Sequence, residues 1–151
     1  MMIKITAEVV IRKAIQEVFD FFANPGNDHL WRQEINEARV SGPIQLGVTV
    51  TEYSKLSARK PNNKIALTCI EFQENERAVF QSMENERFYV RSTREVQKKS
   101  ARETHVVYTL EFDPSIVKFA LGFGLPAFLI SFKAKGDMKK YLSKLKSTLE
   151  S

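Results

Sequence analysis

Near the start of the chain, the spacing of apolar residues changes from the two-residue period of a strand to the spacing of a helix. Apolar and polar side chains alternate over residues 3–12, which predicts a half-buried strand. Residues 14–23 then show helical spacing with apolar side chains on one side. The Asn-Pro-Gly-Asn sequence at 24–27 is typical of a helix break. We expect a second short helix after it, from Asp28 to Ile35.

The middle of the chain consists of short alternating segments separated by polar turns. About six strands are expected between residues 37 and 113, with turns at 42–43, 60–63 and 98–102. Short connections between successive strands indicate an antiparallel meander. On the last strand, alternation predicts that the inward side chains are Val106, Tyr108, Leu110 and Phe112.

The last part of the chain predicts one long amphipathic helix over residues 126–149. Its apolar side chains recur every three or four positions, with lysines roughly opposite. A helix with one apolar stripe and a sheet with one apolar face pack economically when the sheet curves around the helix. We therefore predict a single α+β domain over residues 1–151, with a ligand-sized cavity between sheet and helix.

Composition narrows the chemistry that this domain can support. Apolar residues make up 43% and charged residues 27% of the chain, as in ordinary globular proteins. Cys69 is the only cysteine, and His29 and His105 are the only histidines, so a cysteine zinc cluster is excluded and a histidine metal site is not expected. The sequence has no Gly-rich phosphate loop or serine nucleophile elbow. We expect no metal and no cofactor, and, without a leader-like segment, a cytoplasmic location.

Several stretches together resemble the polyketide cyclase/dehydrase and lipid-transport family of the START-like, birch-pollen-allergen-like superfamily. In family order they are Val18–Pro25 with Trp31, Val40–Pro43, Gly47–Glu52, Ile70–Phe72, Thr104–Phe112 and Leu142–Lys146. The resemblance implies a helix-grip fold with an internal ligand cavity. It does not imply one activity, because that superfamily contains enzymes, carriers and receptors.

An apolar pocket is also suggested by eleven phenylalanines against four tyrosines and one tryptophan, because phenylalanine supplies area without polar groups. From strand parity and helix position, the expected lining is Trp31, Val50, Glu52, Phe72, Phe80, Phe88, Tyr108, Phe112, Phe128, Ala134 and Met138. Each aromatic side chain among them could equally be plain core. Small residues of the helix stripe, such as Ala134, would leave room for a ligand.

Two of these residues are candidates for proton transfer. Glu52 follows an inward-facing alternation, so its carboxylate could act as a base or orient a ligand hydroxyl, or a bulge could turn it outward. The Tyr108 hydroxyl could donate to a ligand carbonyl, or bond to backbone in the core. Arg94 shares parity with Phe88 and Val90, so it could turn inward near the strand end, but we favour a solvated arginine at the rim. We expect Cys69 to face outward and be inert. His29 lacks an orienting carboxylate, and His105 faces the surface.

Residues 116–132 are apolar on all sides but are too short, and too interrupted by Gly and Pro, to span a bilayer. They fit a lid over the cavity or a buried helix start first, then a homodimer contact, then a patch touching a membrane. The whole net charge of +5 lies in residues 114–151, which hold seven lysines and two acids. These lysines lack interleaved aromatics of an RNA-binding type, so no nucleic-acid partner is expected.

The functional hypothesis is a carrier or binding protein for a small to mid-sized hydrophobic molecule or lipid. One alternative is an enzyme of the cyclase/dehydrase type, acting on a polyketide-like substrate with Glu52 or Tyr108 assisting proton transfer. Another is a protein-interaction module that uses residues 116–132. Convergent polar groups in the pocket would favour the enzyme hypothesis. A purely aromatic pocket would favour the carrier, and a filled interior would favour the protein-interaction module.

Overall fold

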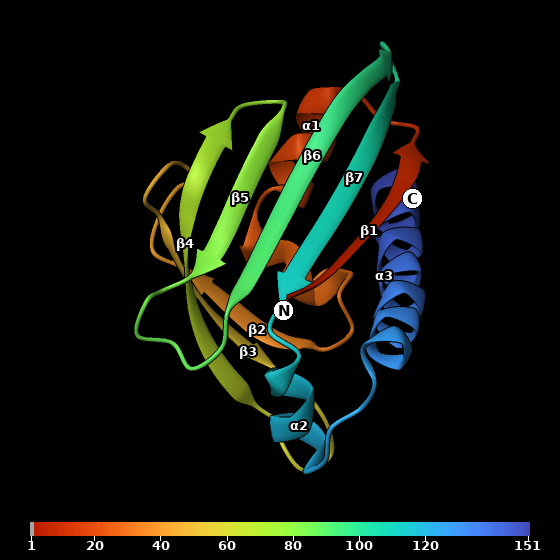
Figure 1. The fold of residues 1–151 in the computed structure, drawn as a ribbon. Coiled ribbons are helices and arrows are strands. Elements are labelled where there is room, and N and C mark those ends of the chain that lie inside the picture. Colours follow the sequence, from red (N-terminus) through yellow and green to blue (C-terminus); the bar gives the residue numbers. More distant parts are fainter. Residues whose placement is uncertain (1) are drawn as a thin grey trace.

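A curled seven-stranded antiparallel sheet packs against a long C-terminal helix in the computed structural model, which describes residues 2–151 (Figure 1). The strands are β1 (Ile3–Ile11), β2 (Ile35–Val40), β3 (Thr49–Ser54), β4 (Asn63–Gln73), β5 (Arg77–Ser82), β6 (Val90–Ser100) and β7 (Glu103–Phe112). The helices are α1 (Ile15–Phe22), the 3-10 helix η1 (Pro25–Leu30), α2 (Ser115–Leu121) and α3 (Ala127–Glu150). The predicted α+β helix-grip architecture is confirmed.

The order of strands in the sheet is β1-β7-β6-β5-β4-β3-β2. Strands β2 to β7 form the predicted meander, and β1 adds to its end by pairing with β7, with Ile3 opposite Phe112. The two strands that are separated only by α1 and η1 therefore occupy opposite edges of the sheet. These short helices carry the chain from one edge to the other.

The second short helix lies earlier than predicted. It begins at Pro25 and ends at Leu30, and β2 begins where the helix was expected to end, at Ile35. The Asn24 side chain accepts a hydrogen bond from the Gly26 N–H at 2.9 Å, and proline suits a first helical turn because its missing N–H would have no partner there. The Asn-Pro-Gly-Asn sequence thus starts a helix rather than only ending one.

A bulge in β4 overturns the predicted orientation of Cys69. The pairing with β5 shifts register between Cys69 and Glu71, so Ile70 is an extra residue and the alternation reverses there. Cys69 consequently faces the core with 1% of its surface exposed, while Ile70 is 39% exposed. Phe72 regains the inner side beyond the bulge and packs on Phe19.

The parity of β7 is confirmed for three of the four predicted inward residues. Val106, Tyr108 and Phe112 are buried. Leu110 is only half-buried and Thr109 on the outer face is buried, which contradicts the prediction for this pair. On the outer face the Thr109 hydroxyl lies 3.1 Å from that of Thr6 on the neighbouring strand.

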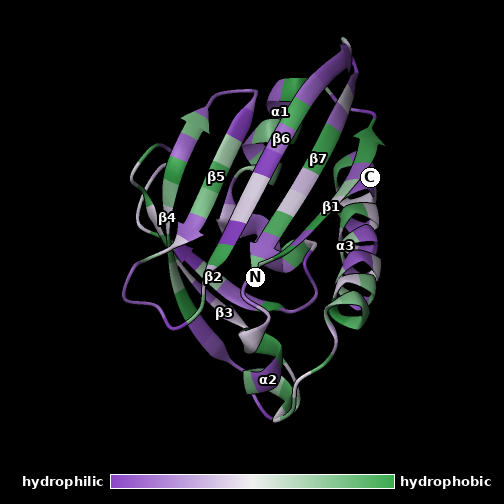
Figure 2. Cartoon of the chain, in the orientation of Figure 1, coloured by the Kyte–Doolittle hydropathy of each residue, from purple (hydrophilic) through white to green (hydrophobic). Residues whose placement is uncertain are grey.

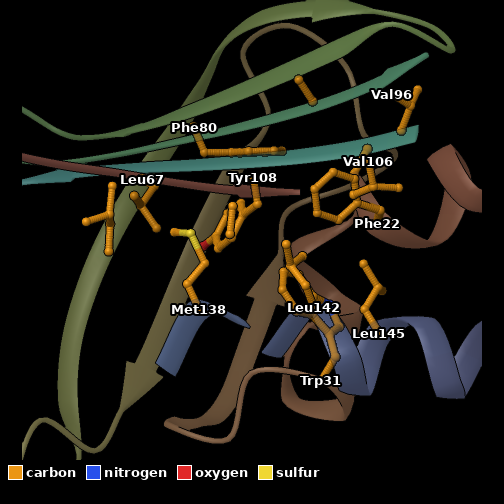
Figure 3. Close-up of a cluster of buried hydrophobic side chains, with 14 of the residues drawn as sticks. Phe22, Trp31, Leu67, Phe80, Val96, Val106, Tyr108, Met138, Leu142 and Leu145 are labelled. Carbon is orange, nitrogen blue, oxygen red and sulfur yellow. The ribbon is translucent and has the colours of Figure 1, made fainter. Parts of the chain in front are cut away.

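The long helix α3 lies along the side of the sheet that carries β1 (Figure 1). Its buried side chains are Ile130, Met138, Leu142 and Leu145, and Figure 3 shows three of them facing Phe22, Trp31 and Tyr108. No helix within residues 2–151 is both long and apolar enough to cross a membrane.

The apolar segment 116–132 is not a buried helix start. Gly122, in the left-handed region at φ 86°, ends α2, and α3 begins only after Pro126. Five large apolar side chains around this break are exposed, namely Phe123, Leu125, Phe128, Leu129 and Phe132. The prediction that Phe128 lines the cavity is therefore wrong, because the first turn of α3 turns that side chain away from the sheet.

Candidate functional site

A partly open cavity of about 290 Å³ lies between the sheet, α2 and α3. Its apolar wall comes from both layers and includes Ile5, Ile65, Leu110, Phe112, Ile116 and Met138. Its polar side chains include Arg32, Glu34, Glu52, Tyr108, Asp137 and Tyr141. The cavity can thus cover an apolar body and offer hydrogen bonds to a polar group.

Five of the residues expected to line the cavity do so: Glu52, Tyr108, Phe112, Ala134 and Met138. Figure 3 shows Tyr108 and Met138 pointing toward one another from the sheet and α3. Glu52 faces inward as predicted, with only 9% of the residue exposed. No bulge displaces it, because β3 keeps its register with β4 along its whole length.

The other expected lining residues lie elsewhere, so the prediction of one shared aromatic pocket is wrong. Val50, Phe80 and Trp31 are in the packed core. Phe72 lies beyond the bulge against Phe19, with ring centroids 5.8 Å apart. Phe88 precedes β6 and packs on Phe119 of α2, with ring centroids 5.2 Å apart.

The Tyr108 hydroxyl is buried and has no hydrogen-bond partner among residues 2–151. The ring is held edge-on by Trp31, at 5.4 Å between centroids, and by Phe22, at 6.0 Å. These contacts fix the ring, so the hydroxyl cannot turn away to find a partner. Burial raises the pKa of Tyr108, although Arg32 and Arg94 act in the opposite direction, so the phenol is neutral and can donate a hydrogen bond.

Arg32 ties three carboxylates together at the polar end of the cavity. Its Nε donates to Glu34 at 3.0 Å, and its Nη1 donates to Asp28 at 3.1 Å and to Glu52 at 3.3 Å. Burial alone would lower the pKa of Arg32, but these acidic neighbours and Tyr108 outweigh it and raise the pKa. Arg32 therefore stays charged and positions Glu52 against the cavity.

Arg94 is not the solvated arginine that was predicted. It is 1% exposed and gives Asp28 two hydrogen bonds, at 2.7 Å and 2.6 Å. A third bond, at 2.9 Å, goes to the backbone carbonyl of Phe22. Asp28, which is fully buried, thus neutralises one arginine and contacts a second, Arg32.

The buried environment at the polar end of the cavity changes the acid–base chemistry of Glu52. Burial raises its pKa, Arg32 lowers it, and the charge of Asp28 raises it again. The net result is a carboxyl group that is protonated more easily than an ordinary glutamate. Such a group can donate or accept a proton near a ligand in the cavity.

Sequence reasoning missed Arg32, Glu34, Asp28 and Tyr141. Arg32 and Glu34 were expected within the second short helix, but that helix ends at Leu30, so the direction of these two side chains could not be predicted. Tyr141 had a usable signal, because it lies three residues after Met138 on the same side of α3. Burial, followed by the charge of Glu34, raises the pKa of Tyr141. Within residues 2–151 no group of three or more His, Cys, Asp or Glu side chains is placed to hold a metal ion.

The family model for polyketide cyclase / dehydrase and lipid transport matches residues 2–150. The chain belongs to this family. No curated protein matches the chain significantly in sequence.

Solved structures share the fold of this family member at low sequence identity. A START superfamily protein from Mycobacterium smegmatis has a TM-score of 0.77 and 8% identity, covering 98% of this chain and 97% of its own. The Zhui aromatase/cyclase from Streptomyces sp. R1128 has a TM-score of 0.74 and 10% identity, covering 99% and 94%. A protein from Deinococcus radiodurans has a TM-score of 0.68 and 13% identity, covering 97% of each chain.

Proposed function

We propose that this protein binds a small hydrophobic molecule with one polar group in the cavity between the sheet and α3. The Tyr108 hydroxyl carries this proposal, because a buried phenol without a partner costs free energy that an acceptor on a ligand would recover. A ligand carbonyl or hydroxyl would receive its hydrogen bond. The apolar body would lie along Leu110, Phe112 and Met138.

The size and charge of the site support a small and uncharged polar group. The cavity volume of about 290 Å³ is at the lower end of that of ligand pockets. Arg32 is already occupied by carboxylates, so an anionic ligand would have to displace one of them. A neutral carbonyl or hydroxyl only has to face Tyr108 and Glu52.

Native mass spectrometry of the purified protein, followed by binding of a hydrophobic fluorescent probe, tests this function. We expect a co-purified small molecule, and a loss of probe or ligand affinity in Tyr108→Phe without a loss of stability. Tyr53→Phe is the matched control, because Tyr53 is on the same sheet but does not line the cavity. Equal binding by the wild type and Tyr108→Phe would contradict the proposed role of the hydroxyl.

A second candidate function is cyclase/dehydrase-type chemistry on a polyketide-like substrate. The convergence of Glu52 and Tyr108 on one cavity favours it, because a carboxyl with a raised pKa and a neutral phenol can exchange protons with a substrate. Incubation with a short β-polyketone, with loss of water followed by mass spectrometry, tests this activity. Turnover by the wild type that is lost in Glu52→Gln, with substrate binding retained, would establish it. The absence of turnover would contradict this second candidate, and ligand binding would remain as the only proposed function.

A further inference from the structure

The exposed side chains Phe123, Leu125, Phe128, Leu129 and Phe132 form an apolar patch on the loop between α2 and α3 and on the first turns of α3. Their exposed fractions range from 38% for Leu125 to 81% for Phe132. Figure 2 shows the hydrophobic start of α3 changing to hydrophilic colours further along the helix. An apolar patch of this kind on a protein surface marks an interaction site.

A row of lysines continues the patch along the outer side of α3. Phe128, Phe132, Lys135 and Lys139 follow one another at spacings of four, three and four residues, so they lie on one face of the helix. All four are exposed. Phe128 and Phe132 of the patch therefore lie on the same side of α3 as Lys135 and Lys139.

The lysines of this region carry charge that the chain itself does not neutralise. The two acids in residues 114–151 are already paired, Asp137 with Lys133 and Glu150 with Lys146. The remaining lysines are Lys118, Lys135, Lys139, Lys140 and Lys144, all exposed. Within the described chain none of these five forms a salt bridge.

We propose that the patch and its lysines dock onto the surface of an anionic lipid membrane. Phenylalanine and leucine side chains would enter the boundary between headgroups and acyl chains. The ammonium groups of Lys135 and Lys139, about one to two helical turns further along, would meet the phosphates. The same two helices line the cavity through Ile116 and Ala134, so docking would bring the cavity close to the membrane.

A second copy of the chain fits this surface less well. In a two-fold dimer the patch meets itself, and the lysines of one copy approach those of the other. No acidic residue occurs between residues 114 and 136, so the segment that carries the patch offers no opposite charge. An anionic membrane supplies both the apolar layer and the negative charge.

Vesicle sedimentation of the full chain tests the proposal with phosphatidylcholine vesicles and with mixed phosphatidylcholine–phosphatidylglycerol vesicles. We expect binding to the mixed vesicles, weakened by salt, and little binding to phosphatidylcholine alone. Phe128→Ser with Phe132→Ser should abolish it. Lys135→Gln with Lys139→Gln should weaken it by at least about tenfold, because each lysine near an anionic surface contributes severalfold to the affinity.

Two control variants match these changes at a distance from the patch. Leu46→Ser removes an apolar side chain that is 67% exposed in the β2–β3 connection. Lys98→Gln with Lys99→Gln removes two charges near the end of β6. Both should bind vesicles as the wild type does, and an equal loss in controls and patch variants would overturn the proposal.

A fluorescent reporter and the solution mass complete the test. Phe132→Trp should shift its emission to the blue with mixed vesicles, above a constant signal from Trp31, which is only 2% exposed. Membrane docking would be refuted if the wild-type protein does not bind the mixed vesicles. It would also be refuted if the wild type is a dimer that Phe128→Ser with Phe132→Ser converts to a monomer. The cavity-filling variant Ala134→Phe should still bind vesicles, which separates this inference from the proposed ligand binding.

Discussion

Arg94 on β6 and Asp28 on η1 form a bidentate ion pair in the interior, with hydrogen bonds of 2.7 Å and 2.6 Å. Their side chains are 2% and 0% exposed. The pair joins the sheet to the short helix that carries the chain between the two sheet edges. Since Asp28 also accepts a hydrogen bond from Arg32, it fixes the residue that in turn positions Glu52.

Replacing Asp28 by alanine should destabilise the protein strongly. Two buried arginines would lose their shared carboxylate, and breaking a buried pair in this way costs about 3–5 kcal/mol. Urea unfolding measures the effect. Glu37→Ala is the control, because it breaks the exposed pair with Arg39 and should cost less than about 1 kcal/mol. Similar losses of unfolding free energy in the two variants would mean that the buried ion pair stabilises the protein no more than an exposed one does.

The stability gained by Glu52→Gln should depend on pH. Burial raises the folded-state pKa of Glu52 above its unfolded value, so its contribution is fully present below about pH 4.3 and is lost as pH rises through the folded pKa. Glutamine does not titrate, so the free energy of unfolding of the variant should rise relative to that of the wild type as pH rises from about 4 to 7. Urea unfolding across this range checks the sign. A difference that stays constant, or that shrinks toward pH 7, would contradict the raised pKa.

Ala134→Phe should fill the cavity without unfolding the protein. Ala134 lines the cavity, so a phenylalanine ring can enter existing space. Probe binding should be lost at an unchanged melting temperature. Ala78→Phe is the control, because Ala78 is fully buried in the core, where the larger side chain should cost about 1–3 kcal/mol or more. A large fall in the melting temperature of Ala134→Phe would mean that this region is close-packed.

Acid should weaken the contact between the end of α3 and β1. Glu150 accepts hydrogen bonds from Lys146 at 2.7 Å and from the Arg12 backbone N–H at 2.8 Å, and these lower its pKa to about 2. The resulting stability is present above about pH 4.3 and lost as pH falls toward 2. Glu150→Gln should therefore be less stable than the wild type at pH 7, with the difference closing over this window. A pH-independent difference in urea unfolding would rule out the titration of Glu150 as its source.

Local periodicity predicted the elements well because it reflects which side of each segment is buried. Strand alternation placed Glu52 and Tyr108 on the cavity side, and the helix stripe placed Ala134 and Met138 there. Periodicity gave the wrong side where a single extra residue shifts the alternation of a strand. The bulge at Ile70 reversed the faces of β4, and nothing in the alternation before it announces an extra residue.

Long-range pairing could not be predicted from one sequence. The burial of Arg94 depends on Asp28, 66 positions away. Strand parity allowed an inward Arg94, but without a known carboxylate partner a charged side chain was expected at the solvated rim. The prediction that Phe128 lines the cavity was wrong for a related reason. An apolar stretch indicates burial, but the rotation of α3 about its axis is set by Met138, Leu142 and Leu145 further along the helix.

The position of β1 has a consequence for synthesis of the chain on the ribosome. Of the seven strands this one is translated before the others, yet its sheet partner is β7. Val10 near its end and Arg12 just after it are held by Lys146 and Glu150. Its apolar face therefore remains uncovered while the next hundred or so residues emerge, and the native structure can close only after residue 150 is made. The nascent chain should depend on chaperones over this interval, because contacts of such long sequence separation form late.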